Sequence, residues 1–314
     1  MNIFIKVCFF VLCASPRVHA ISLVYNLKIR RAFNYPISPL LKKDKKALWV
    51  ASAVPIVYKR DRHIVDPAFG IDVVDKRLTS GSLFNVRYIP RPTWWAELST
   101  GFEHEHAQVS GTSIIDASRT GFDDIVFSVG HNFFIKKNTQ FVLYALGGVP
   151  SRLKVTPNEA QDTLVGTRFF SVGVGSEFSY SFINSLPQSL VVIFQNRFLH
   201  FFNRRWPILP PGSSIQPGNV TDLLFAIDYR HKKNAFEIGY NPTIFSNQAV
   251  ILPTQTIGTH AFVRQSGFAS YSRLFEKLPL LHRPGLIGTG LLVSRAHHLD
   301  IKIVSIWVNF TTVF

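Results

Sequence analysis

The sequence predicts an all-β chain that closes into an antiparallel transmembrane β-barrel of about 12 strands, within a range of 12–14. Apolar and polar residues alternate with period two in segments of about ten residues, which are separated by turn residues. After residue 20 there is no apolar run of about 18 residues, so a transmembrane helix is not expected. Only 17% of the 314 residues are charged, whereas 28 are Phe, a balance that suits strands facing lipid.

The first element is interpreted as a secretory signal peptide over residues 1–20. Lys6 precedes the apolar segment 7–14, and Val18-His19-Ala20 places small residues at a cleavage site. That apolar segment is too short to span a bilayer, which needs about 20 residues. We therefore expect export through the secretory pathway, with cleavage after Ala20.

The remainder is expected to form two parts, a periplasmic lead-in over 21–46 and the barrel over 47–314. Both cysteines, Cys8 and Cys13, belong to the signal segment, so the mature chain should have neither disulfides nor thiolate metal ligands. The net charge of +15 is basic enough to suggest nucleic acid. Export argues against nucleic acid and favours lipid, lipopolysaccharide or small solutes as partners.

The barrel strands are predicted from thirteen alternating segments. They are 47–58, 64–74, 82–89, 93–105, 121–135, 139–148, 164–180, 189–200, 220–231, 234–245, 259–273, 286–295 and 299–314. Bacterial single-chain barrels have even strand numbers. Either 64–74 is a loop, which gives twelve strands, or 21–33 adds a fourteenth. We favour twelve.

The alternative is a soluble β-sandwich, which also alternates. The polar face of a sandwich would carry long charged side chains in water, whereas Gly, Ser, Thr and Asn dominate the polar face of these segments. Aromatic residues such as Trp94-Trp95 and Trp206 also gather at strand ends, as in the aromatic girdles of outer-membrane barrels. Connection lengths agree with a barrel. Short periplasmic turns are expected near 136–138, 181–188 and 231–234, and longer outer loops near 106–120, 149–163, 201–219 and 246–258.

The last strand resembles the C-terminal signal of Gram-negative outer-membrane β-barrel proteins. Ile306, Val308, Phe310 and the terminal Phe314 alternate on one face, and Thr312 departs from the pattern. The resemblance implies location in the cell outer membrane and recognition by the barrel-insertion machinery.

A second resemblance covers one hairpin. The hairpin begins with Gly121-Phe122-Asp123-Asp124 and a strand, turns at Lys-Lys-Asn, and ends with a second strand that finishes in Gly147-Gly148-Val149-Pro150-Ser151. It is similar to a hairpin of the MetA-pathway outer-membrane proteins. Those proteins are barrels linked with uptake of aromatic compounds and are similar to fatty-acid channels. That family tends to end the hairpin on Pro-Thr-Gly, whereas this chain has Pro150-Ser151-Arg152. No substrate is carried over.

The candidate site is the inward face of the predicted barrel, where charges of both signs fall. Rings or rows of charge inside a pore select ions and orient solutes, but the same charges can instead pair across a narrow barrel and fill it. The predicted lumen-lining residues are Glu97, Glu103, Glu177, Asp228, Glu237, Arg87, Arg197, Arg230 and Arg264.

Other motifs suggest little chemistry. In Glu103-His104-Glu105-His106 the two His share a strand face but lack a third metal ligand, so neither a metal nor a cofactor is expected. A Gly-x-Ser-x-Gly elbow is missing, so an enzyme is not expected. Arg204-Arg205, in a predicted outer loop beside Trp206, could bind lipopolysaccharide phosphates.

These observations favour a passive, porin-like channel for small solutes, or an uptake pore for hydrophobic compounds. A non-conducting barrel with a structural or adhesive role is the main alternative, and a membrane-embedded lipid hydrolase is a less favoured one.

Overall fold

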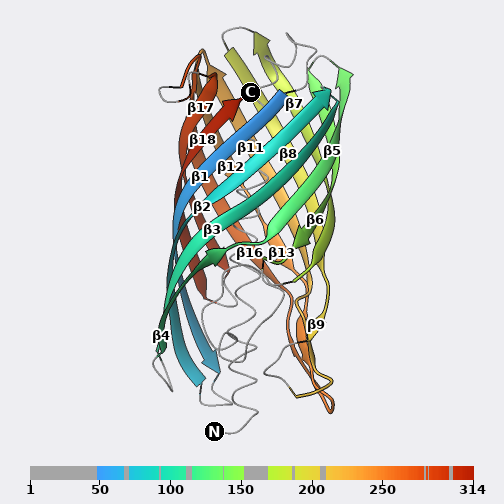
Figure 1. Ribbon diagram of the computed structural model, residues 1–314, viewed down its shortest axis with the longest axis vertical. Coiled ribbons are helices and arrows are strands. Elements are labelled where there is room, and N and C mark those ends of the chain that lie inside the picture. The colour runs from blue at the N-terminus through green and yellow to red at the C-terminus, as the bar shows by residue number, and fades with distance from the viewer. Residues whose placement is uncertain are drawn as a thin grey trace.

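The chain forms a closed antiparallel barrel of 12 strands (Figure 1). This computed structural model describes residues 48–66, 71–91, 93–110, 115–136, 138–151, 169–185, 188–205, 210–278, 281, 283–296 and 300–314. Successive strands pair with each other, and the barrel closes where β1 pairs with β18. The predicted fold class and strand number are confirmed. Within these ranges no helix is long and apolar enough to cross a membrane.

Twelve paired positions make up the wall. They are β1 (Leu48–Asp66), β2 (Ile71–Arg91), β3 (Trp94–Ser110), β4 with β5 (Ile115–Phe122 and Ile125–Lys136), β6 (Thr139–Val149), β7 (Ser171–Ser185), β8 (Gln188–Phe201), β11 (Asn219–His231), β12 with β13 (Asn234–Tyr240 and Thr243–Phe245), β16 (Phe262–Phe275), β17 (Gly285–Ala296) and β18 (Ile301–Val313). Two of these positions are interrupted strands. Both β4 and β5 pair with β3, and both β12 and β13 pair with β11. The second interruption contains Pro242, which has no N–H for the ladder.

Residues 64–74 do not form a separate strand, which leaves twelve strands in the wall. These residues form the end of β1 and the start of β2, joined by residues 67–70. Both strands continue well beyond their apolar parts, because polar residues such as Lys59 and Asp61 keep the alternation and the pairing. The predicted extra strand at 21–33 lies outside the described residues, as do the signal peptide and the lead-in.

The barrel has two different mouths. At one, here called the terminal mouth, the Trp49 N–H donates to the Phe314 carbonyl at 3.2 Å and the Phe314 N–H donates to the Trp49 carbonyl at 2.8 Å. Figure 1 shows the C-terminus there, with the ends of β17 and β18. The opposite end is here called the loop mouth.

The expected outer loops are only partly loops. Segments 201–219 and 246–258 contribute a second, four-stranded sheet made of β9 (Arg204–Arg205), β10 (Ser214–Gln216), β14 (Gln248–Ile251) and β15 (Thr256–Thr259). The expected loop at 106–120 is wrong, because β3 and β4 extend through most of it and leave only 111–114 between them. Residues 152–163 of the loop expected at 149–163 lie outside the described part.

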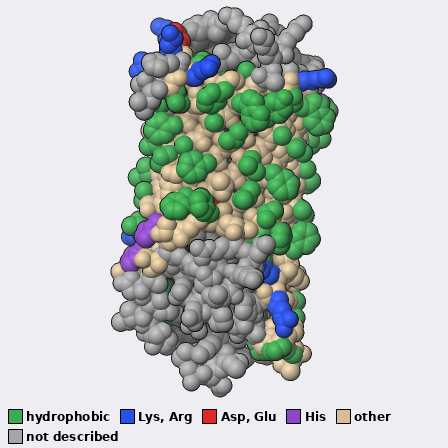
Figure 2. Space-filling model, in the orientation of Figure 1, with side chains coloured by type: hydrophobic (Ala, Val, Ile, Leu, Met, Phe, Trp, Pro, Cys, Tyr) green, Lys and Arg blue, Asp and Glu red, His purple; other side chains and the backbone are tan. Residues whose placement is uncertain are grey.

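Apolar side chains cover the outside of the wall. In β3 exposed and buried residues alternate almost without interruption, and in β5 the exposed members are Ile125, Phe127, Val129 and Phe133. Figure 2 shows hydrophobic side chains over the middle of the barrel and Lys and Arg side chains toward its ends. The apolar rows therefore face outward, as a lipid-facing surface requires, instead of meeting between two stacked sheets.

Aromatic pairs mark the terminal mouth. The Trp49 and Tyr88 rings are 4.6 Å apart, and those of Phe236 and Tyr271 are 5.0 Å apart. Aromatic girdles of this kind lie at membrane interfaces. The expectation that Trp95 belongs to such a girdle is wrong, because Trp95 points inward and is 6% exposed. Trp206, another expected member, lies outside the described residues.

Candidate functional site: the inward face of the barrel

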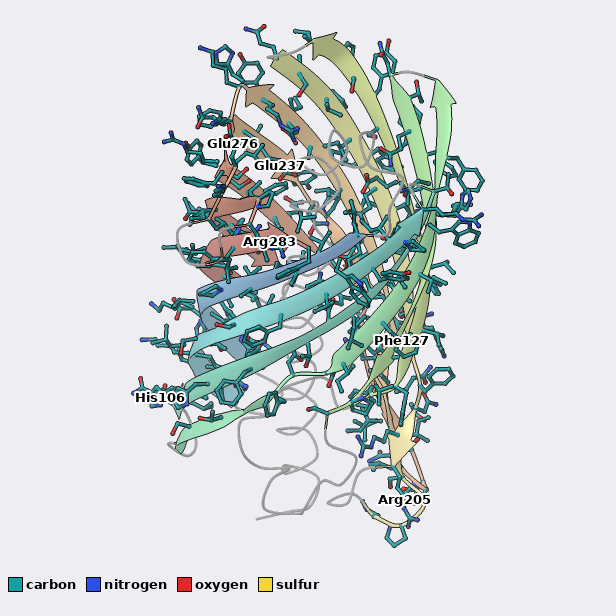
Figure 3. The ribbon with its side chains drawn as sticks, turned by 45° about the horizontal axis from the view of Figure 1, so that its top comes forward. His106, Phe127, Arg205, Glu237, Glu276 and Arg283 are labelled. Atoms are coloured by element: carbon teal, nitrogen blue, oxygen red, sulfur yellow. The ribbon has the colours of Figure 1, made fainter. Side chains whose placement is uncertain are left out.

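The nine predicted lumen-lining residues all occupy inward positions of their strands. Six of them are buried, namely Glu97, Glu103, Glu177, Arg87, Arg197 and Arg264. Asp228, Arg230 and Glu237 are partly exposed on β11 and β12 toward the terminal mouth, and Figure 3 labels Glu237. A role in conduction stays a prediction for all nine.

One ion pair lies near the terminal mouth. Arg87 of β2 and Glu97 of β3 are directly opposite each other, and the Arg87 Nε donates to the Glu97 Oε2 at 2.7 Å. The Arg87 guanidinium also lies 4.4 Å from the centre of the Trp95 ring, and the Ser99 hydroxyl donates to the Glu97 Oε1 at 3.3 Å. Both additional partners, Trp95 and Ser99, belong to β3, the strand of Glu97.

A polar row crosses four adjacent strands in the middle of the barrel. Arg197 of β8 faces Asp222 of β11, Asp222 faces Thr243 of β13, and Thr243 faces Arg264 of β16. The Arg197 Nε donates to the Asp222 Oδ2 at 3.1 Å, and the Thr243 hydroxyl donates to the Asp222 Oδ1 at 2.7 Å. The Arg264 guanidinium donates to the Thr243 hydroxyl at 3.1 Å. Two guanidinium groups and one carboxylate give this row a net positive charge.

A third network, toward the loop mouth, was missed from the sequence. The Arg77 Nε donates to the Asp75 Oδ1 at 2.8 Å, and its Nη1 donates to the Glu105 Oε1 at 2.7 Å. The Arg60 Nη2 donates to the Asp75 Oδ2 at 3.3 Å. Burial tends to raise the pKa of Asp75, but Arg60 and Arg77 outweigh it and hold that pKa at about 2. The sequence signal for this network is the alternation of Tyr58, Arg60 and Arg62, which continues past the predicted strand end at residue 58.

These ion pairs run along the wall. Each one joins residues of the same strand or of hydrogen-bonded neighbours, which lie about 4.8 Å apart. A network that filled the barrel would instead join strands on opposite sides. The described pairs of Arg60, Arg77, Arg87 and Arg197 therefore lie along the wall and do not bridge the interior.

Large inward aromatic rings also lie against the wall, each beside a glycine directly opposite on the next strand. The pairs are Trp95 with Gly130, Tyr144 with Gly175, Phe268 with Gly239, and Trp307 with Gly290. A Cβ on Gly130, Gly175 or Gly290 would lie 2.2 Å from the ring opposite, and one on Gly239 would lie 2.3 Å from it. Each ring thus occupies the space that a side chain would take, so only glycine lets it lie flat.

Part of the inner face is apolar, which corrects the expectation of a lumen lined by small polar and charged residues. The apolar inward residues include Val191, Ile193 and Leu199 of β8, Leu224 of β11, Leu292 of β17, and Ile301 and Ile303 of β18. The sequence signal was present in 189–200, where both faces carry apolar residues. The inner wall is therefore amphipathic, with apolar stretches beside charged rows.

The C-terminal residues keep their predicted alternation. Ile306, Phe310 and Phe314 are exposed by 57%, 44% and 53%, and Val308 is partly exposed. Thr312, the departure from the pattern, is buried, and its hydroxyl donates to the Pro284 carbonyl at 3.2 Å. Recognition of this strand by insertion machinery stays a prediction.

The remaining motifs lie outside the inner face. Figure 3 shows His106 on the outer side of β3, and His104 is exposed with its Nδ1 2.7 Å from the Thr120 hydroxyl. In the described part of the chain no three His, Cys, Asp or Glu residues gather as metal ligands would. Arg204 is partly buried, and Arg205 is exposed in the four-stranded sheet, where Figure 3 labels it.

The fold and its outward apolar belt are those of a 12-stranded antiparallel β-barrel with a lipid-facing surface. No protein-family model and no curated protein matches the sequence. An outer membrane channel from Pseudomonas putida F1 is similar in structure, with a TM-score of 0.62 and 10% identity over 86% of this chain and 96% of that one. The transport unit of the autotransporter AIDA-I from Escherichia coli has a TM-score of 0.51 and 8% identity over 90% and 96%. At such identities these similarities show the fold.

Proposed function

We propose that the protein is a passive channel for small solutes in the outer membrane of a Gram-negative bacterium. The observation that carries this proposal is the arrangement of the inner face, where charges pair along the wall and large rings lie flat against it. Both features keep these charged and aromatic side chains at the wall, which suits a passage more than a packed core. The P. putida structure, itself called an outer membrane channel, supports the same reading.

The proposed orientation places the terminal mouth in the periplasm and the loop mouth outside. Short turns such as residues 232–233 lie at the terminal mouth, and the four-stranded sheet lies at the other, which is the asymmetry of outer-membrane barrels. Export with cleavage after Ala20 and insertion guided by Ile306, Val308, Phe310 and Phe314 complete this proposal. Arg204 and Arg205 would contact lipopolysaccharide from the outer sheet.

A passive channel needs no bond-making chemistry, only a path whose polarity matches its solute. The row from Arg197 to Arg264 would attract an anionic or polar group, because it carries two guanidinium groups for one carboxylate. The apolar side chains of β8 and β18 would contact the rest of the solute. Uptake of hydrophobic compounds is the second candidate, and this apolar part of the wall is the observation that favours it.

Conductance in planar bilayers tests the main proposal. The purified full chain should produce discrete current steps in KCl, and Arg264→Gln should move the reversal potential in a salt gradient toward cation preference. Arg273→Gln is the matched control, since Arg273 is exposed on the outside of the same strand. A protein that is folded but gives no steps would contradict the channel and favour the structural or adhesive role.

Ligand binding separates the second candidate from the first. Trp95 and Trp307 face inward, so a small apolar solute in the lumen should quench their fluorescence. Trp49, Trp94 and Trp206 would be replaced by Phe, so that only Trp95 and Trp307 contribute to the fluorescence. Quenching that saturates supports hydrophobic uptake, whereas conductance without it supports small polar solutes.

A further inference from the structure

A row of basic side chains crosses the outside of the barrel at the loop mouth. Arg295 of β17 lies directly opposite Lys302 of β18, Lys302 opposite Asp61 of β1, and Asp61 opposite Lys76 of β2. All four occupy outward positions; the three cations are exposed and Asp61 is partly so. The row therefore presents cations from four adjacent strands to the outside.

The single carboxylate of this row already has a partner. The Lys59 Nζ lies 3.2 Å from the Asp61 Oδ2, and both side chains are well exposed. Lys59 stands one outward position from Asp61 on the same strand. The four cations Lys59, Lys76, Arg295 and Lys302, here called the basic patch, thus outnumber the acid by three charges.

Three cations of the basic patch, Lys76, Arg295 and Lys302, lie immediately beyond the apolar belt. The next outward residues toward the terminal mouth are Leu78, Val293 and Val304, which are exposed by 50%, 51% and 44%. Successive outward residues in a strand are about 6.7 Å apart. These three cations are therefore one step past the lipid-facing residues, at the level of the lipid headgroups, and Lys59 lies at the edge of the belt, opposite Leu78 and Val304.

The basic patch is local to one side of the barrel. On other strands, outward residues toward the same mouth include Thr120, Val172, His200 and Ile244. At the described outward positions next to the belt on those strands there is neither Lys nor Arg. A general girdle of strand-end charges would be spread around the wall, so this concentration requires a separate explanation.

The charges of the patch suit a phosphorylated ligand. Like charges directly opposite on neighbouring strands are destabilising, and Arg295 and Lys302 have that relation. A phosphate between them would turn the repulsion into charge-assisted hydrogen bonds. From Arg295 to Lys76 the row spans three strand spacings, about 14 Å, which is wide enough for more than one phosphate group.

We propose that the basic patch binds the phosphate groups of a phosphorylated lipid headgroup in the outer leaflet. This site is separate from Arg204 and Arg205, which belong to the four-stranded sheet. It requires the barrel to sit in the membrane as described but does not depend on conduction. Current steps in planar bilayers would therefore be unaffected if this inference failed.

The test is a titration of the purified full chain, in uncharged detergent, with a diphosphorylated glucosamine-based glycolipid, followed by native mass spectrometry. The triple variant Lys76→Gln, Arg295→Gln, Lys302→Gln should weaken binding by at least about tenfold, equivalent to about 1.4 kcal/mol. Removing the phosphates from the glycolipid should weaken binding to the unaltered protein to a similar degree. Heat-modifiable mobility on gels verifies that each variant is folded.

The matched control removes the same charge from the other mouth, through Arg91→Gln, Arg273→Gln and Lys277→Gln, which are all exposed. Its binding should stay within about twofold of the unaltered protein, or about 0.4 kcal/mol. Unchanged binding in the patch variant, an equal loss in both triple variants, or equal binding of the dephosphorylated glycolipid would overturn the proposal. Displacement of the glycolipid by an equal concentration of inorganic phosphate would also overturn it, because free phosphate would then be the ligand.

Discussion

The contact between Gly175 and the Tyr144 ring gives the sharpest prediction for conduction. Gly175→Val would place a Cβ 2.2 Å from the Tyr144 Cζ, whereas carbon atoms in contact lie about 3.5–4.0 Å apart. The ring must therefore retreat by about 1.3 Å or more. The added side chain would stand between the ring and the wall, so the ring should turn toward the lumen.

The magnitude follows from what Tyr144 loses. Its hydroxyl accepts a hydrogen bond from Gln195 Nε2 at 2.8 Å, and the required movement breaks that bond. Overpacking costs about 1–3 kcal/mol, and a lost hydrogen bond costs about 0.5–1.5 kcal/mol. We expect the unfolding free energy of Gly175→Val to fall by about 2–4 kcal/mol.

Single-channel conductance and denaturant-induced unfolding measure the two effects. Conductance should fall in Gly175→Val and should be restored when Tyr144→Ala is added, because the displaced ring is then absent. Gly267→Val is the control, since Gly267 faces outward on β16 and a Cβ there has nothing within 4 Å. If Gly175→Val and Gly267→Val both conduct and unfold like the unaltered protein, the idea that glycines hold the rings at the wall is refuted.

Further predictions concern the charged networks and the last strand. Glu97→Gln leaves the buried Arg87 guanidinium without its carboxylate and should cost about 3–5 kcal/mol in denaturant unfolding; a loss below 1 kcal/mol, as for an exposed pair, would contradict this. The pKa of Asp75 is about 2 in the folded protein, against an ordinary value of 3.8. Its stabilisation should be complete above about pH 4 and lost as the pH falls through about 2, so Asp75→Asn should unfold with less dependence on pH between those values. Deleting Phe314 should reduce the folded, heat-modifiable fraction recovered from outer membranes, whereas equal recovery would contradict an insertion role.

The sequence predicted the outward face better than the inward one. Lipid contact favours apolar side chains at the outward positions of the belt, so the alternation in segments such as 125–133 identifies both the strand and its outward side. An inward position has no such uniform demand, and Val191 and Arg197 stand on the same face of β8. The expectation of a uniformly polar lumen failed for this reason. The network of Arg60, Asp75 and Arg77 was missed because strand-forming alternation continues beyond the belt, where hydropathy no longer marks it.

Strand register is the property that the sequence could not supply. Trp95 and Gly130, or Gly290 and Trp307, are far apart in the chain and become neighbours only through the pairing of β3 with β5 and of β17 with β18. A shift of two residues in the pairing of β3 with β5 would place Trp95 opposite Ser128 or Asn132 and force the ring away from the wall. The register of β2 with β3 aligns Arg87 with Glu97, so β3 carries both Trp95 and one member of this ion pair. A substitution that shifts β3 against both of its neighbours should therefore disturb the ion pair and the ring position together, and a variant that changed conductance without changing either would show that conduction is controlled elsewhere.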